Sequence, residues 1–499
     1  MTERPRIVAG RALVCGVEPD GTPRIVEDGA VLVLEGRIAS IGRTAELRRQ
    51  HPDAAVEGGP GFVVAPGLVN AHHHVGLTPL QLGSPDHPLE LWFASRIALR
   101  DVDLYADTLF SAFEMIESGV TTVQHLHSRV PGGAEDWLAA AERVIAAYRD
   151  VGMRASYSIG IRDQNRLVYE ADDQFTARLP VELRPAMEAF FARTTLPLAD
   201  QVAVTEELHR RHGGGALIRV QIAPHNLHWL SDAALEATAA LAARTGLPLH
   251  MHLLETPYQE AYARKRTGGS ALAHIDRFGL VSPKLTIGHG VWMTEADLDL
   301  AAERGACLCH NCSSNMRLKS GRLDLNRVRA RGIPVALGID EAGINDDRDM
   351  LQEMRLVLRA HRKPGIDTAC PSPSDIFRMA TEGGARTTPF AAEIGRLAPG
   401  MAGDLVLFDW REVTYPYQDD AVPLVDVLVQ RAKAKAISAV MVGGEWILRE
   451  RRFLRIDRDA VLAGIAEALA RPRSPAERDR VAFAAAVMPH VRRFYEGYL

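Results

Sequence analysis

The chain has 499 residues, of which 47% are hydrophobic and 24% charged, the balance of a globular protein with a large core. Its formal net charge of −5 gives no electrostatic reason to expect a nucleic acid or an anionic membrane as partner. The first residues, MTERPRIVAG, contain no apolar signal core and no apolar run is long enough to span a membrane, so the sequence predicts a cytoplasmic protein.

Residues 1–65 contain the apolar runs RIVAGRALVC, AVLVLEG and RIASIG, separated by glycine and Asp-Gly turns. This pattern is typical of short strands joined by tight turns. It returns at residues 391–456, and we expect the two segments to form one small, discontinuous β-sandwich domain. Residues 457–499 are rich in alanine and arginine and predict a helical C-terminal tail.

Between these segments, at residues 66–390, apolar strands alternate with helical stretches, as in βα units around a parallel sheet. We therefore predict an α/β fold with a (β/α)8 TIM-like barrel as the hydrolase domain. Two long stretches, 75–100 and 162–200, follow strands and would lie on the C-terminal face, where barrel active sites form. The expected strands are Leu68–His74, Val120–His127, Arg154–Gly160, Leu217–Ala223, Leu247–Leu253, Leu285–His289, Ala306–His310 and Val335–Asp340.

The chain contains five cysteines, an odd and sparse set that argues against a disulfide framework. Cys309 and Cys312 form a C-x-x-C pair. It can be interpreted as a redox or zinc pair, or, the interpretation we favour, as two small buried residues at a strand end. The eighteen histidines are more informative, because many of them cluster directly after apolar strands.

Histidines in PGLVNAHHHVG predict half of a metal site. His72 and His74 are two residues apart on a strand, so their side chains point to the same side, whereas His73 points to the other. Two imidazoles at the end of a barrel strand provide two metal ligands. The alternative is a set of solvent-exposed loop histidines.

Three further strand ends carry groups of the same kind. His252 and Glu255 lie in LPLHMHLLET, His289 ends LTIGH, and Asp340 ends VALGID. Singly, each has an ordinary structural interpretation, as a core histidine or a helix cap. Together with the first pair, they predict a site in which three imidazoles and one carboxylate surround a divalent metal that activates water, while a further carboxylate and imidazole move protons. Zn²⁺ is the favoured ion and Fe²⁺ the alternative.

With these residues in place, the sequence resembles the amidohydrolase superfamily, and most of all its cytosine-deaminase-like branch. That branch includes triazine hydrolases, guanine and 8-oxoguanine deaminases, and adenosine-derivative deaminases. The resemblance covers about residues 60–445. The matching stretches, in the order of the family, are PGLVNAHHHVG, GVTTV, APH, HMHLLET, GHGVWMTEADL, HNCSSNMRLKSG, LGID, ATEGGAR and IGRLAPGMAGDLVLFD.

The resemblance implies a role for each site residue. The metal ligands would be His72, His74, His252 and Asp340. Glu255 would protonate a ring nitrogen of the substrate, while His289 and Asp340 would take the proton from the attacking water. His225 and Trp92 match residues that contact the substrate. The sequence departs from the family pattern at Cys312, and also at His125, His127 and Glu341. These last three residues could contact the substrate, or they could lie behind the substrate-contacting residues or on the surface.

The position of lysine bears on the number of metals. Many amidohydrolases bridge two metals with a carbamylated lysine at the end of the fourth strand, but this chain has no lysine before Lys265. The resemblance therefore implies a one-metal site.

The leading hypothesis is hydrolytic deamination of a small amino-substituted N-heterocycle, such as a purine, pterin, pyrimidine or triazine, with release of ammonia. One alternative is hydrolysis of a cyclic amide or of a chloro- or alkylamino-triazine. Another is a non-catalytic metal-binding barrel. The resemblance also implies a homodimer or a larger homo-oligomer.

Overall fold

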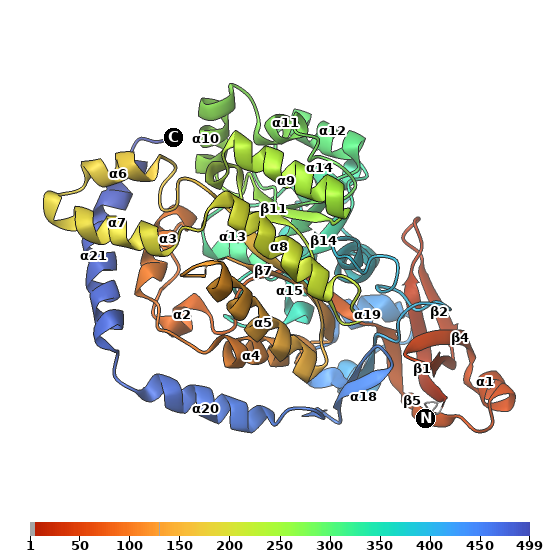
Figure 1. The fold of residues 1–499 in the computed structure, drawn as a ribbon. Coiled ribbons are helices and arrows are strands. Elements are labelled where there is room, and N and C mark those ends of the chain that lie inside the picture. The colour runs from red at the N-terminus through yellow and green to blue at the C-terminus, as the bar shows by residue number, and fades with distance from the viewer. Residues whose placement is uncertain (1–4, 129) are drawn as a thin grey trace.

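The computed structural model describes residues 5–128 and 130–499. We predict no signal core in the first ten residues. Of these ten, residues 1–4 lie outside the described residues. Among the helices that are described, none is both long enough and apolar enough to cross a membrane. Strands from both ends of the chain gather on one side of the molecule, and helices surround parallel strands in the remainder (Figure 1).

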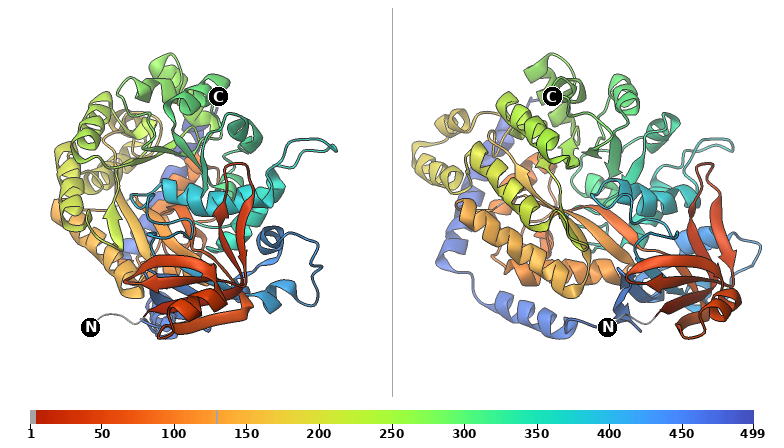
Figure 2. Two further views of the ribbon diagram at one scale, coloured as in Figure 1. Left: turned by 90° about the vertical axis from the view of Figure 1, so that its right-hand side faces the viewer. Right: turned by 45° about the vertical axis from the view of Figure 1, so that its right-hand side comes forward.

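The strands near the two ends of the chain form one nine-stranded sheet, in the order β18-β17-β16-β15-β5-β1-β3-β4, with β2 paired to β1. The two ends meet where β15 runs antiparallel to β5. Both views in Figure 2 show this sheet at one end of the molecule. Its strands are β1 (Arg6–Val17), β2 (Pro23–Glu27), β3 (Gly29–Leu34), β4 (Arg37–Arg43), β5 (Ala55–Pro66), β15 (Leu405–Asp409), β16 (Ile437–Val442), β17 (Glu445–Arg449) and β18 (Arg452–Phe453).

The central part of the chain forms two parallel sheets, which confirms the α/β class. One has the order β10-β8-β7-β6, with β9 paired to β8, and the other has the order β11-β12-β13-β14. Isolated parallel bridges join them at both edges, between His73 and Asp340 and between Ile222 and Leu249. The strands are β6 (Leu68–His73), β7 (Val120–His127), β8 (Arg154–Ile161), β9 (Ile218–Val220), β10 (Ala223–Pro224), β11 (Leu249–Leu253), β12 (Leu285–His289), β13 (Cys307–His310) and β14 (Val335–Leu337).

Each strand expected between residues 68 and 340 has a counterpart, with two differences. The expected strand Leu217–Ala223 is divided into β9 and β10, and β14 ends at Leu337 rather than at Asp340. After β14 the backbone turns, and Asp340 has a positive φ of 66°, which a regular strand does not allow.

Helices alternate with the parallel strands along the chain. Thr294 and Asp297 form a capping box at the start of α12. The helices of this region are α4 (Leu104–Glu117), α5 (Ala134–Val151), α8 (Leu198–His212), α9 (Asp232–Thr245), α10 (Pro257–Thr267), α11 (Ala271–Asp276), α12 (Glu295–Arg304), α13 (Cys312–Arg317), α14 (Leu325–Ala330), α15 (Met350–Ala360), α16 (Pro373–Arg378) and α17 (Gly384–Arg386); α1 (Thr44–Gln50), α18 (Trp410–Thr414) and α19 (Leu424–Arg431) accompany the nine-stranded sheet.

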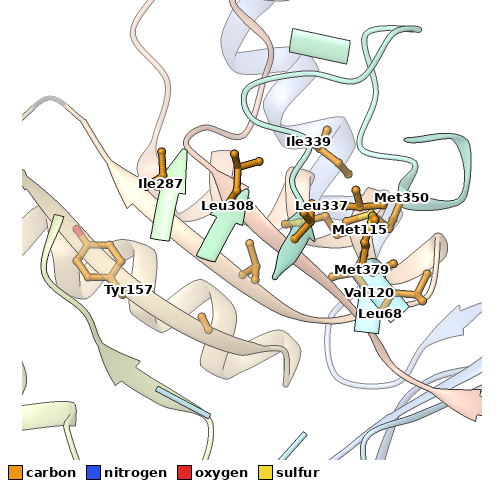
Figure 3. Close-up of a cluster of buried hydrophobic side chains, with 14 of the residues drawn as sticks. Leu68, Met115, Val120, Tyr157, Ile287, Leu308, Leu337, Ile339, Met350 and Met379 are labelled. Atoms are coloured by element: carbon orange, nitrogen blue, oxygen red, sulfur yellow. The ribbon is translucent and has the colours of Figure 1, made fainter. Parts of the chain in front are cut away.

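The core of the parallel region lies between these strands and helices. Figure 3 shows part of it: Leu68, Val120 and Leu337 lie beside methionines, whereas Tyr157, Ile287 and Leu308 lie on the strands away from them. The labelled residues are Leu68, Met115, Val120, Tyr157, Ile287, Leu308, Leu337, Ile339, Met350 and Met379. This packing fixes the strand ends that carry the candidate site.

The C-terminal tail contains α20 (Arg458–Ala470) and α21 (Pro475–Tyr495). It runs along the outside of the molecule, and α21 passes beside the two long insertions (Figure 1). These insertions contain α2 (Pro79–Leu82), α3 (Leu89–Ser95), α6 (Asp172–Arg178) and α7 (Arg184–Arg193). Residues of α3, α6, α7 and α21 share one buried apolar cluster. The tail therefore fastens the segments that lie over the strand ends.

A buried ion pair connects the parallel strands to the nine-stranded sheet. Arg154, the first residue of β8, donates to both carboxylate oxygens of Asp404, at 2.8 and 2.9 Å. Both side chains are 3% exposed. The Gly443 amide donates to the same carboxylate at 2.7 Å. Because this bidentate pair is removed from water, loss of either partner would leave an uncompensated charge.

Replacing Asp404 with asparagine tests the importance of this contact. We expect the free energy of unfolding to fall by about 3–5 kcal/mol, because a buried guanidinium loses its counter-ion. Urea denaturation followed by circular dichroism measures the change. The control is Glu206→Gln, which breaks an ion pair with Arg244 whose side chains are 53% and 43% exposed; there we expect about 1 kcal/mol or less. Equal losses in both variants would contradict the prediction.

Candidate active site

The predicted metal ligands come together at the C-terminal ends of the parallel strands. His72 belongs to β6 and His74 follows it, while His252 belongs to β11. The Nε2 atom of His74 lies 3.0 Å from that of His72 and 3.0 Å from that of His252. The Oδ1 atom of Asp340 lies 3.3 Å from Nε2 of His74 and 3.7 Å from Nε2 of His72. Four side chains thus direct ligand atoms at one point.

Backbone carbonyls determine which ring nitrogens face this point. The Nδ1 atom of His74 lies 2.5 Å from the Leu126 carbonyl, and that of His252 lies 2.9 Å from the His225 carbonyl. A carbonyl only accepts hydrogen bonds, so each Nδ1 carries the proton and each Nε2 is a bare lone pair. Burial holds the pKa of both rings below the ordinary value and keeps them neutral.

The donor set fits a divalent cation. Two nitrogen lone pairs at 3.0 Å repel each other unless a positive charge lies between them. Neutral imidazoles oriented by carbonyls through their other nitrogen, with one carboxylate beside them, are typical ligands of Zn²⁺. The ligand atoms of His72, His252 and His289 also lie within 4.8 Å of one another, so His289 stands at the edge of the same cluster.

Asp340 and His289 are held by the short helix α13. Ser314 donates to Oδ2 of Asp340 at 2.7 Å, and Nδ1 of His289 donates to Oδ1 of Asn315 at 2.8 Å. The Nε2 atom of His289 lies 3.7 Å from Oδ2 of Asp340. Both residues have positive φ, 68° for His289 and 66° for Asp340, which costs about 1–3 kcal/mol each for a residue other than glycine. Such strain is typical of functional sites.

The Glu255 carboxyl lies beside His289. Its Oε1 atom accepts a hydrogen bond from Ser320 at 3.0 Å and lies 3.7 Å from Nδ1 of His289. The side chain is almost completely buried, and burial raises its pKa to about 7, partly opposed by His289 and supported by Asp340. A carboxyl with a pKa near neutrality can both donate and accept a proton.

Glu255, His289 and Asp340 line one cavity together with His74 and His252. Three of the predicted substrate-binding residues also line it: Trp92 of α3, His225 after β10, and Glu341. Glu341 pairs with Arg96 at 2.6 Å, and the Arg96 guanidinium lies 4.6 Å above the Trp92 ring. The cavity therefore combines aromatic walls with a few polar groups, as small-molecule sites do.

The other two predicted substrate-binding residues lie elsewhere. His125 and His127 are on β7 and line a neighbouring cavity, which shares His74 and Arg96 with the first. Each has a tyrosine as hydrogen-bond partner at 2.8 Å: Tyr148 for His125 and Tyr157 for His127. Contact of these two histidines with a substrate stays a prediction.

Several residues of the site were not identified from the sequence. Ser314, Asn315 and Ser320 lie in the stretch HNCSSNMRLKSG, so their position after a strand end was a usable signal. Arg96 and Arg162 lie in the two long insertions, where the spacing of residues gives no information about direction. Arg162 lines the cavity, and no hydrogen bond or ion pair to its side chain is found within residues 5–128 and 130–499. Burial lowers its pKa to about 10.

The sequence comparison identifies the class of protein that this site defines. Residues 63–447 match the model of the amidohydrolase family, and the chain belongs to this family. It is 30% identical over 458 residues to a 5-methylthioadenosine/S-adenosylhomocysteine deaminase from Nitratidesulfovibrio vulgaris (strain DP4), covering 91% of this chain and 94% of the relative. It is 29% identical over 391 residues to a 5'-deoxyadenosine deaminase from Methanothermobacter thermautotrophicus, covering 77% and 82%.

Solved structures show the same fold. An adenosine deaminase from Xanthomonas campestris with bound zinc has a TM-score of 0.79 and 26% identity, covering 95% of this chain and 98% of that one. An atrazine chlorohydrolase from Arthrobacter aurescens in complex with zinc has a TM-score of 0.79 and 19% identity, covering 92% and 99%. The second is similar in fold alone.

Replacing His74 with alanine tests the metal cluster. We expect this variant to lose one divalent ion per chain relative to the unsubstituted protein, because the lone pair central to the cluster is removed. Elemental analysis of the purified, dialysed proteins measures the ions, and circular dichroism checks the fold. The control is His51→Ala, a histidine at the end of α1, a helix that packs on the nine-stranded sheet and not on the site strands. An unchanged metal content in His74→Ala would rule out this ligand set.

Proposed function

We propose that the chain is a metal-dependent hydrolytic deaminase of an amino-substituted N-heterocycle, with His72, His74, His252 and Asp340 holding one divalent ion. The observation that carries the proposal is the position of Glu255, a buried carboxyl with a near-neutral pKa in the same cavity as the converging imidazoles. A metal site alone would not need such a group. A heterocycle with a basic ring nitrogen does.

The support for one ion is the absence of a bridging lysine. At the fourth strand position, β9 and β10 contain only Ile218–Val220 and Ala223–Pro224. Zn²⁺ is the ion we favour and Fe²⁺ the alternative. When bound, such an ion supplies Lewis-acid activation of water and lowers its pKa toward neutrality.

The residues of the chain then move the protons. Asp340 and His289 accept a proton from the attacking water, whose oxygen bonds to the ring carbon that carries the amino group. Glu255 gives its proton to the adjacent ring nitrogen, which makes that carbon more electrophilic. The amino nitrogen then takes up the proton that Asp340 and His289 hold, the carbon–nitrogen bond breaks, and ammonia leaves. The new hydroxyl group gives its proton to Glu255, so that a carbonyl remains on the ring and Glu255 is protonated again.

For the substrate we propose an adenosine derivative, because the similar proteins are named as methylthioadenosine/S-adenosylhomocysteine and deoxyadenosine deaminases. In this arrangement the purine lies against Glu255 and the Trp92 wall, and His225 contacts the ring. The Arg162 guanidinium would then meet a polar or anionic group at the other end of the substrate.

The finer description of the fold is also a proposal. The bridges at both edges of the two parallel sheets support their closure into an eight-stranded barrel at residues 66–390. The shared sheet supports a small sandwich domain of residues 1–65 and 391–456, with 457–499 as a helical tail. A cytoplasmic location and a homodimer or larger homo-oligomer stay predictions, as does the absence of nucleic-acid and membrane partners.

A product screen distinguishes the proposed reaction from its alternatives. The metal-loaded protein is incubated with aminopurine nucleosides, aminopterins, aminopyrimidines and triazines, with and without a chelator. Chelator-sensitive ammonia release is expected, first from 5'-substituted adenosines. A ring-opened acid, chloride or an alkylamine would instead identify the alternative hydrolases. Bound metal without any turnover would favour a non-catalytic barrel.

Replacing Glu255 with glutamine tests its role as proton donor. We expect kcat to fall about 10²–10⁴-fold, since this is the usual contribution of a positioned general acid or base, while metal content and unfolding midpoint stay unchanged. The control is Glu90→Gln, a second buried carboxyl, bonded to Thr256 and Tyr169 and not lining the cavity. Near-full activity in Glu255→Gln would exclude the role.

Replacing Arg162 with glutamine tests its proposed contact with the substrate. We expect KM for the best substrate to rise about tenfold or more with little change in kcat, because a hydrogen bond to a charged group contributes about 1.5–3 kcal/mol. Steady-state kinetics measures both parameters. A fall in kcat at constant KM would place Arg162 with the reacting groups instead.

A further inference from the structure

A second group of metal-binding side chains lies behind the candidate active site. It consists of His310, the last residue of β13, Cys312, the first residue of α13, and His361, which follows α15. One ligand atom from each lies within 4.8 Å of the other two. None of these residues belongs to the ligand set described above. All three are buried, with side chains 1%, 2% and 4% exposed.

The hydrogen bond between the imidazoles of His310 and His361 leaves one buried ring nitrogen without a partner among the described residues. The Nε2 atoms of His310 and His361 are 2.9 Å apart, so one can donate to the other. The Nδ1 atom of His310 is buried and has no hydrogen-bond partner among the residues that the structure describes. Beside this pair lies the thiol of Cys312. Two imidazoles and one thiolate are a ligand combination that Zn²⁺ binds in proteins.

The structure separates Cys312 from the other half of the C-x-x-C pair. Cys309 donates to Oδ1 of Asn311 at 3.4 Å, and its sulfur groups with His72 and His250 rather than with Cys312. Both cysteines are free and buried. The C-x-x-C motif therefore forms neither a redox disulfide nor a pair that chelates one metal ion. Its second cysteine, Cys312, lies in a cluster with two histidines.

We propose that His310, Cys312 and His361 bind a second ion of the Zn²⁺ class, with a structural role. Three protein ligands leave one position of a tetrahedral site for water. Binding converts the Cys312 thiol into a thiolate and releases its proton to solvent, so the site gains affinity as the pH rises. His361 adjoins residues 362–370, which are exposed and give the ion a path of entry.

The ion would fasten the helix that positions the catalytic groups. It would tie the start of α13 to the ends of β13 and α15, and α13 holds Asp340 through Ser314 and His289 through Asn315. A further contact already joins the same elements, because Ser313 donates its amide to Glu353 of α15 at 3.1 Å. The second site is thus a positioning device and touches no substrate.

Metal counting in variants of the full chain tests this proposal independently of activity. We expect two ions per chain in the unsubstituted protein, one in His74→Ala, one in Cys312→Ala and none in the double variant. The two matched controls, Cys309→Ala and Cys370→Ala, should keep both ions. If His74→Ala retained no ion, or Cys312→Ala retained two, the second site would be disproved, whatever the fate of the proposed deaminase activity.

A spectroscopic measurement covers the case in which Cys312→Ala does not fold. Apo-protein of the His74→Ala variant is titrated with Co²⁺, and the expected result is a thiolate-to-cobalt charge-transfer band at one equivalent. The same band should persist in His74→Ala combined with Cys309→Ala. We expect it to vanish, with the ion, in His74→Ala combined with His361→Gln. Its absence from His74→Ala, or its loss on removing Cys309, would overturn the proposal.

Discussion

The site depends on an enforced contact between two nitrogen lone pairs. The carbonyls of Leu126 and His225 take the Nδ1 protons of His74 and His252, and the strands then hold the bare Nε2 atoms 3.0 Å apart. Buried polar atoms without a partner are costly, and facing lone pairs are worse. A cation between the two nitrogen atoms removes this repulsion, because each lone pair is then attracted to the positive charge. The neutral form of the buried imidazoles is what the ion needs, so the fold prepares the ligands before any ion arrives.

The helix α13 holds His289 and Asp340, the two groups proposed to accept a proton from water. His289 and Asp340 have strained backbones, and such strain persists only where neighbours impose it. Ser314 and Asn315 are those neighbours. Further out, α21 packs on the insertions that carry Trp92 and Arg96, so a helix at the very end of the chain supports the cavity wall. The supports of the site therefore come from several separate segments of the chain.

The sequence could predict the strands and the convergence of His72, His74, His252 and Asp340, because both follow from local patterns. Alternation along a strand places His72 and His74 on one side, and parallel strands bring their C-terminal ends together. The sequence could not show which cavity His125 and His127 line. Alternation along a strand determines the side of the sheet on which a side chain lies, but not the cavity that it meets. The tyrosines that bond to these two histidines come from other parts of the chain. The packing of α21 and the direction of Arg162 depend on long loops, whose conformation is set by tertiary contacts rather than by periodicity.

The charges of the cavity narrow what it can hold. Arg96 is neutralised by Glu341 and stacked on Trp92, so it acts as part of the wall. Glu341 is a departure from the family pattern, and a glycine there would leave Arg96 as a second open cation. With Glu341 present, Arg162 is the guanidinium whose side chain has no hydrogen-bond or ion-pair partner across the described residues of the cavity. A ligand that is neutral at both ends would leave this buried charge unpaired. The cavity therefore favours a heterocycle that carries a polar or anionic group for Arg162 to bind.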